Sequence, residues 1–115
     1  MKKKILIIQG SSLKKINIKT DTSFFLGLEA QRRGYQIYYY EPKDLSFING
    51  KVTALCSKIK FKDNPKQPVK VLSKTVLNLL QAKLILIRSE PPFNQQYINT
   101  TFILEHISKK VRIIN

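Results

Sequence analysis

The chain has 115 residues and a formal net charge of +14, from 21 Lys or Arg against 7 Asp or Glu. Its length suits one domain with a modest core, and its apolar runs are far shorter than the roughly 20 residues that cross a membrane. One cysteine, Cys56, excludes an intrachain disulfide, and one histidine, His106, leaves too few ligands for the usual zinc site. We therefore expect a protein of the reduced cytoplasm with no membrane partner.

The positive charge admits two interpretations. A strongly basic surface is typical of proteins that bind nucleic acid. The lysines are scattered along the whole chain, however, and the accompanying abundance of Ile and Asn is typical of an AT-rich genome. This distribution favours a solvated basic surface, with a basic nucleic-acid-binding domain as the less favoured alternative.

The first forty residues predict a strand, a helix and a second strand. An uninterrupted apolar run predicts a strand at residues 3–8 that is covered on both faces. A helix is expected from residue 22 to about residue 33, and residues 35–40 follow as a strand, which completes a right-handed βαβ unit. The helix is marked by Thr20 or Asp21 as its cap, by a Glu29–Arg33 pair and by Gly34 after its end.

The rest of the chain continues the alternation. Asn49-Gly50 lies between two β-rich runs and predicts a tight hairpin, because both residues accept positive φ. Pro65 and Pro68 mark a loop at residues 61–68. The remaining expected elements are a short strand at residues 69–72, a short helix at 75–81, a strand at 83–87, a helix from Asn94 to about Lys110 and a last strand at 111–114. The pattern predicts an α/β layer fold around a mainly parallel sheet, with a β-hairpin insertion.

Two polar loops, at residues 9–19 and 88–93, leave the carboxyl ends of predicted strands. Ligands of open α/β sheets bind beyond these ends, and neighbouring parallel strands would bring both loops to one edge. Arg88 could there hold a carboxylate through two parallel hydrogen bonds. Glu90 could orient Arg88 or accept from an ammonium group. The alternative is that Arg88 and Glu90 form only an internal salt bridge.

Polar residues also surround the start of the first predicted helix. Free N–H groups at a helix start can bind an anion, but Asn17, Thr20, Asp21 and Ser23 can equally serve as ordinary caps. The stretch at residues 10–15 lacks the second glycine of a P-loop, and G-x-G-x-x-G is absent. We therefore expect no nucleotide site in this chain.

Three further features are expected to be structural. Cys56 should be a half-buried residue at the end of a hairpin strand rather than a nucleophile. His106 should be either a surface histidine or a hydrogen-bonded one on the last helix. The tyrosines at residues 38–40 should pack on both faces of a strand, with a platform for stacking bases as the alternative.

Two segments carry a resemblance to a known family. The first reads NIKTDTSFFLGLEAQRRGYQIYYYEPKDL and the second RSEPPFNQQYINTTFILE. In residues, order and spacing they resemble motifs of bacterial-type glutathione synthetases, and the similarity covers essentially the whole chain. The resemblance implies a Rossmann-like, three-layer N-terminal domain that precedes an ATP-grasp module. It also implies a ligase, in which ATP phosphorylates the carboxylate of γ-glutamylcysteine and glycine attacks the acyl phosphate.

The same resemblance implies which residues bind substrate. Arg88 matches the family's arginine, and Glu90 takes the place of its aspartate. The chain departs from the family at Gln9-Gly10, where an Asp-Pro pair is common, and at Asn94, which replaces an aspartate. No catalytic residue is implied in this chain. The residues implied for substrate binding are Arg88, Glu90, Asn17, Asp21, Ser23 and Tyr97.

Residues 1–115 are accordingly expected to form the N-terminal substrate-binding, pre-ATP-grasp domain of a glutathione synthetase, as a fragment or domain of a longer protein. The expected partners are γ-glutamylcysteine, glycine, the missing ATP-grasp domain and further copies in a homo-oligomer. ATP and Mg²⁺ belong to the full-length enzyme and no cofactor to this chain, which alone should be inactive. The alternative is a stand-alone, non-catalytic relic or interaction module.

Overall fold

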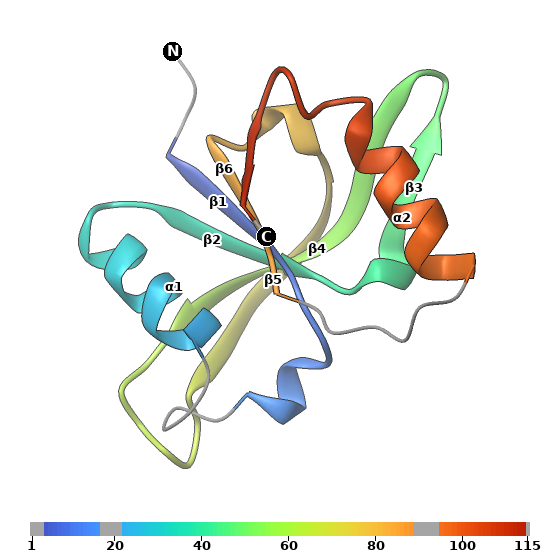
Figure 1. Cartoon of the computed structure of the whole chain (residues 1–115). Coiled ribbons are helices and arrows are strands. Elements are labelled where there is room, and N and C mark those ends of the chain that lie inside the picture. The colour runs from blue at the N-terminus through green and yellow to red at the C-terminus, as the bar shows by residue number, and fades with distance from the viewer. Residues whose placement is uncertain (1–3, 17–21, 89–94, 115) are drawn as a thin grey trace.

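The computed structural model describes residues 4–16, 22–88 and 95–114. Within them, a seven-stranded sheet lies between two α-helices (Figure 1). No helix among these residues is long and apolar enough to cross a membrane. The strands are β1 (Ile5–Gln9), β2 (Gln36–Tyr40), β3 (Leu45–Ile48), β4 (Lys51–Phe61), β5 (Val69–Asn78), β6 (Leu84–Ile87) and β7 (Arg112–Ile114). The α-helices are α1 (Thr22–Arg32) and α2 (Gln95–Glu105), and three 3-10 turns are η1 (Leu13–Lys15), η2 (Pro42–Asp44) and η3 (Leu79–Gln81).

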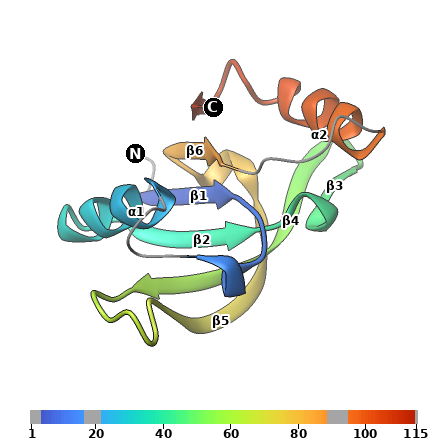
Figure 2. The same cartoon turned by 60° about the horizontal axis from the view of Figure 1, so that its bottom comes forward.

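The sheet has a parallel part and an antiparallel part. Its order is β3-β4-β2-β1-β6-β7, and β5 pairs with the other edge of β4. Strands β2, β1, β6 and β7 are parallel, and the arrows of β1 and β2 point the same way in Figure 2. Strands β3, β4 and β5 join them in antiparallel fashion. The predicted α/β class is confirmed, and the hairpin of β3 and β4 forms the antiparallel part together with β5.

Strand β1 is buried along its whole length because a helix covers each face of the sheet. Ile7 packs in a core cluster with Leu104 of α2, and Leu6 packs in a second cluster with Phe24 of α1. We call these two sides the α2 face and the α1 face. The apolar run in the sequence predicted this double coverage, since every side chain of such a strand meets apolar neighbours.

Strand β4 is long enough to contribute to both cores. Val52, Ala54 and Cys56 belong to the cluster on the α2 face, whereas Ile59 and Phe61 belong to the cluster on the α1 face. The ribbon of β4 and β5 accordingly curls past the edge of the parallel strands (Figure 2). One strand thereby links the two layers of the core.

Helix α1 is fastened to β4 through Phe61. The rings of Phe24 and Phe61 meet edge to face, with centroids 5.4 Å apart. The amide Nε2 of Gln31 donates to the carbonyl oxygen of Phe61 at 3.0 Å, and the backbone N–H of Phe61 donates to Gln31 Oε1 at 2.5 Å. Gly27 leaves room for the ring, because an added Cβ would lie 2.1 Å from Phe61 Cε2. A glycine therefore stands inside α1 for packing, although it disfavours the helix itself.

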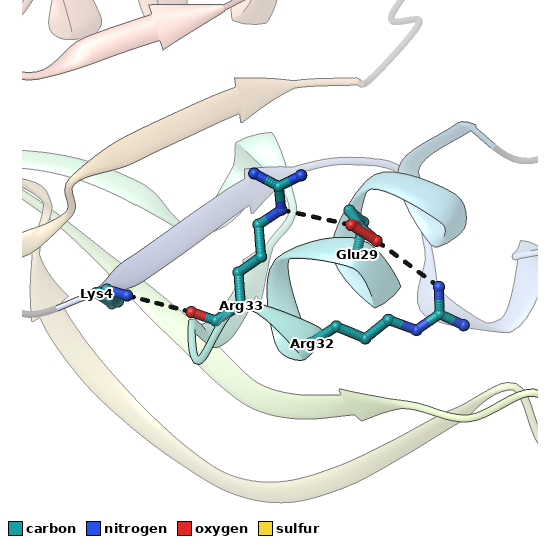
Figure 3. Close-up of polar contacts among 4 residues, drawn as sticks. All are labelled: Lys4, Glu29, Arg32 and Arg33. Carbon is teal, nitrogen blue, oxygen red and sulfur yellow. Dashed lines mark hydrogen bonds and ion pairs between the residues drawn. The ribbon is translucent and has the colours of Figure 1, made fainter.

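The end of α1 is as the sequence predicted. Gly34 has a positive φ of 88°, and Glu29 forms the expected pair with Arg33, at 3.4 Å (Figure 3). Glu29 also contacts Arg32 at 3.7 Å, and Lys4 Nζ donates to the carbonyl of Arg33 at 3.3 Å. These contacts are exposed, so each ion pair contributes only about 0–1 kcal/mol.

The predicted hairpin is also confirmed. Asn49 has φ 52° and Gly50 has φ 75°, and the two residues join β3 to β4. Positive φ at both central positions gives the turn a twist that matches the paired strands.

The predicted short helix at residues 75–81 is wrong. Strand β5 continues to Asn78, with one register shift in its pairing with β4, and only the three residues of η3 are helical. Pairing with β4 outweighs the local helix signal, because β-branched Thr75 lies directly opposite Cys56 in the ladder. The predicted short strand is the beginning of this longer one.

The last helix is shorter than predicted. Helix α2 ends at Glu105, because the amides that follow bond three residues back instead of four. Examples are His106 N–H to the carbonyl of Ile103 at 3.2 Å and Lys110 N–H to that of Ile107 at 2.9 Å. Strand β7 follows as predicted. The expected helix start at Asn94 lies outside the described residues.

Candidate functional site

The carboxyl ends of β2, β1 and β6 lie side by side at one edge of the parallel part (Figure 2). Gln9, the last residue of β1, is in register with Tyr40 on one side and Ile87 on the other. The backbone N–H of Arg88 then donates to the carbonyl of Gln9 at 2.7 Å. The two loops that follow β1 and β6 thus leave side by side, as predicted. We call Gln9, Gly10, Tyr40 and Arg88 the carboxyl rim.

Gln9 is a buried polar residue within this rim, only 3% exposed. Its Oε1 accepts a hydrogen bond from the hydroxyl of Tyr40 at 2.7 Å. Burial, with a smaller contribution from Cys56, raises the pKa of Tyr40, so this hydroxyl stays protonated and donates. An unpaired buried polar group would cost about 1–3 kcal/mol, which explains why the two side chains meet.

A second tyrosine contacts the same loop from the other face. Tyr39 packs in the cluster on the α1 face, and its hydroxyl donates to the carbonyl of Ser11 at 2.6 Å. Gly10 lies between Gln9 and Ser11 in the chain, and a Cβ added to it would be 2.0 Å from the Tyr39 hydroxyl oxygen. Only glycine therefore fits beside this ring. The backbone N–H of Gly10 also donates to the carbonyl of Tyr40 at 3.1 Å.

Three of the predicted site residues lie in the described part of the chain. Arg88 is exposed at the end of β6. Ser23 lies in the first turn of α1 and is only 6% exposed, whereas Tyr97 lies in the first turn of α2 and is 37% exposed. Three predicted residues lie outside the described part of the chain: Asn17, Asp21 and Glu90.

Both helices begin on the carboxyl side of the sheet. Helix α1 connects β1 to the parallel strand β2, and α2 connects β6 to the parallel strand β7. Their first turns carry Ser23 on the α1 face and Tyr97 on the α2 face. The sheet therefore lies between Ser23 and Tyr97, and Arg88 follows β6 at its carboxyl edge.

The expectation for Cys56 needs correction. The residue lies in the middle of β4, not at a strand end, and it is 0% exposed instead of half buried. Burial, with a contribution from the nearby charge of Asp44, raises the pKa of Cys56 to about 12. A thiol that stays protonated out of reach of solvent is no nucleophile, as expected.

The tyrosines at residues 38–40 pack on both faces, as predicted. Tyr38 and Tyr40 belong to the α2 face and Tyr39 to the α1 face, and none is more than 9% exposed. Buried rings cannot stack on nucleic-acid bases, so this observation removes the aromatic platform that was the alternative.

His106 is exposed just beyond α2, where its ring lies 4.3 Å from that of Phe47. Its exposure agrees with the predicted surface histidine, but the residue lies beyond the helix on which it was expected. Across residues 4–16, 22–88 and 95–114, no three His, Cys, Asp or Glu side chains are grouped as metal ligands.

Sequence reasoning missed the support beneath the rim. Gln9 and Gly10 stood out only as departures from a family pattern, and the hydroxyls of Tyr39 and Tyr40 were not assigned partners. The sequence did contain a signal for this support, namely a polar residue at the end of an apolar strand. A polar side chain buried at such a position almost always has a hydrogen-bond partner.

Comparison with known proteins identifies the family. Residues 4–115 match the family model described as prokaryotic glutathione synthetase, N-terminal domain. The chain is 39% identical over 115 residues to the glutathione synthetase of Mesorhizobium japonicum, which covers 100% of this chain and 36% of that protein. It is 40% identical over 99 residues to the glutathione synthetase of Escherichia coli K12 and 39% identical over 99 residues to that of Vibrio parahaemolyticus, with 86% of this chain and 31% of each relative covered.

The chain thus spans about a third of the length of the curated relatives it matches. The two segments noted in the sequence lie within the matched residues, and the α/β fold with its loops at one sheet edge agrees with the resemblance. This chain belongs to the family of prokaryotic glutathione synthetase N-terminal domains.

Proposed function

We propose that the chain is the substrate-binding N-terminal part of a glutathione synthetase. Family membership and the printed names of its relatives support this proposal. In the reaction, ATP phosphorylates the carboxylate of γ-glutamylcysteine, and glycine attacks the acyl phosphate to release phosphate and form glutathione. The proposal includes a cytoplasmic enzyme that works as a homo-oligomer.

ATP and Mg²⁺ are assigned to the remainder of the ligase, an ATP-grasp domain. The relatives are about three times as long as this chain, which leaves ample length for such a domain. The direction of the last strand fits this arrangement. Ile114 of β7 is in register with Leu86 of β6 in a parallel pair. A polypeptide continuing from β7 would therefore leave at the carboxyl edge of the sheet, the edge at which Arg88 lies. The proposed substrate site would then lie between the two parts.

Arg88 is proposed to hold a carboxylate of γ-glutamylcysteine. The observation that carries this role is the hydrogen bond from its backbone to Gln9, at the carboxyl edge of adjacent parallel strands. Arg88 is exposed there, and a planar guanidinium pairs well with a carboxylate. The loops at this edge of an α/β sheet are the usual ligand position.

The other proposed substrate residues have different roles. Ser23 is nearly buried, so we assign it to organising the start of α1 rather than to direct contact. Tyr97 is partly exposed at the start of α2 and could reach the ligand from the opposite face. Asn17, Asp21 and Glu90 retain the roles that the resemblance implies: anion binding at the helix start for the first two and orientation of Arg88 for the third.

Calorimetric titration of the purified chain with γ-glutamylcysteine tests the role of Arg88. Arg88→Ala should weaken binding roughly 10- to 100-fold, the loss expected for charge-assisted hydrogen bonds. Arg88→Lys should give an intermediate loss, because an ammonium group keeps the charge without the bidentate geometry.

Arg112→Ala is the matched control. Arg112 is also an exposed arginine on a parallel strand, but it stands at the amino end of β7, at the opposite edge of the sheet. Its loss should leave the affinity unchanged. Measurable binding that is equal for wild type and Arg88→Ala would refute the proposed substrate site.

A further inference from the structure

The carboxyl rim combines a buried side-chain hydrogen bond with the backbone bonds that continue the parallel ladder. Gln9 bonds in two directions at once: its side chain accepts from the Tyr40 hydroxyl at 2.7 Å, and its carbonyl accepts from the N–H of Arg88 at 2.7 Å. The N–H of Gly10 adds a bond to the carbonyl of Tyr40 at 3.1 Å. The end of β1 is thereby connected to β2 on one side and to Arg88 on the other.

The two tyrosines hold this segment from opposite faces. Tyr40 reaches Gln9 from the α2 face, and Tyr39 reaches the carbonyl of Ser11 from the α1 face at 2.6 Å. The Tyr39 ring also fills the space that a side chain at Gly10 would need. Residues 9 and 11 therefore each accept a hydrogen bond from a tyrosine, one from each face of the sheet.

Fixing this segment bears directly on Arg88. The residue is exposed, and its backbone N–H donates a hydrogen bond to the carbonyl of Gln9. A long arginine side chain loses conformational entropy when it binds a ligand. If its backbone is already ordered, the total entropy lost on binding is smaller. The hydrogen bond to Gln9 thus ties the backbone of Arg88 to the end of β1.

We propose that Gln9 and Tyr40 are positioning residues for Arg88, which together fix the arginine for carboxylate binding. The inference rests on the proposed function, because it assumes that Arg88 holds the substrate carboxylate. Neither Gln9 nor Tyr40 is exposed to the ligand, since they are 3% and 2% exposed. Their effect on binding therefore passes through Arg88.

The first test needs no ligand. Amide hydrogen exchange of the ¹⁵N-labelled chain should show exchange of the Arg88 amide rising roughly fivefold in Tyr40→Phe, because a buried hydrogen bond beneath it is lost. Tyr38→Phe is the matched control. It removes one hydroxyl from the same strand and the same face, two residues from the rim, and should leave the Arg88 amide unchanged.

The second test is a double-mutant cycle on γ-glutamylcysteine affinity, measured by NMR titration. Tyr40→Phe should weaken binding roughly fivefold when Arg88 is present and by less than about twofold in the Arg88→Ala background. A merely structural role would instead lower affinity equally in both backgrounds. Gln9→Met, which removes the acceptor but keeps the backbone carbonyl, should reproduce both results.

The outcomes separate the two proposals. If Tyr40→Phe leaves Arg88 amide exchange unchanged, or lowers affinity equally in both backgrounds, the positioning role is overturned while the substrate role of Arg88 stands. If Arg88→Ala binds γ-glutamylcysteine as the wild type does, the proposed substrate site is overturned, and the positioning role with it. Faster exchange together with coupling through Arg88 supports both.

Discussion

At the scale of single residues, the carboxyl rim depends on polar groups that are buried and matched. Gln9 is almost completely enclosed, yet its side chain and carbonyl both have partners. The position of Arg88 could be predicted from the sequence, because an arginine directly after an apolar strand must lie at the strand's end. The partner of Gln9 could not, since it depends on the register between β1 and β2, which no local pattern specifies.

A prediction at this scale concerns the buried thiol of Cys56. Its pKa is about 12 in the folded chain, against a usual value of 9.0. Below pH 9 both states keep the proton, so the thiol adds no pH dependence. Above it the unfolded chain loses the proton first, and unfolding is favoured as pH rises toward the folded pKa. The thiol should therefore remove about 1 kcal/mol of stability between about pH 9 and pH 10.

Urea unfolding of wild type and Cys56→Ala across this range measures the effect. The variant should be less stable at pH 7, because it leaves a cavity, but its stability should fall less steeply as pH rises. Tyr40, whose pKa is raised mainly by burial and less by Cys56, stays protonated in both folded proteins over this range, and the other alkaline groups titrate in both and cancel in the difference. Parallel stability curves for the two proteins would show that Cys56 titrates normally in the folded chain.

At the scale of elements, local sequence patterns failed to predict the structure where long-range strand pairing determines the conformation. Helix α1 was predictable because its end markers act within one turn, as Gly34 and the Glu29–Arg33 pair show. The second half of β5 was not, because its strand conformation comes from pairing with β4, some twenty residues earlier. The sequence around Thr75 carries no sign of that partner, and tertiary pairing overrides propensity.

Gly27 provides a prediction for α1. Alanine is the better helix former by about 1 kcal/mol, so Gly27→Ala should stabilise an isolated helix. In this fold the new Cβ would lie 2.1 Å from Phe61 Cε2, and overpacking of this kind costs about 1–3 kcal/mol. We expect a net loss of stability in thermal or urea unfolding.

The matched test of this mechanism is Phe61→Leu. If the clash is the cause, the cost of Gly27→Ala should shrink in the Phe61→Leu background, where the ring is absent. An equal cost in both backgrounds would mean that Gly27 is required for another reason.

At the scale of the whole molecule, the antiparallel ribbon and the parallel strands contribute side chains to the same two core clusters. β4 contributes side chains to both clusters, which means that neither half of the sheet has a complete core by itself. The fold class and the shared edge of the two loops were predictable from the alternation of elements. The curl that lets one strand serve both faces was not, because it arises from the length and pairing of β4 and β5.

The division of labour in the proposed ligase leads to the last prediction. The chain has no P-loop motif, its described residues hold no cluster of metal ligands, and it spans about a third of its relatives' length. Incubated with ATP, Mg²⁺, γ-glutamylcysteine and glycine, the isolated chain should release ADP no faster than a blank, while still binding the dipeptide in the titration. This combination would distinguish a substrate-binding part from an inactive relic that binds nothing. ADP release proportional to the concentration of the purified chain would contradict the assignment of ATP to the remainder of the ligase, because it would require a nucleotide site within these 115 residues.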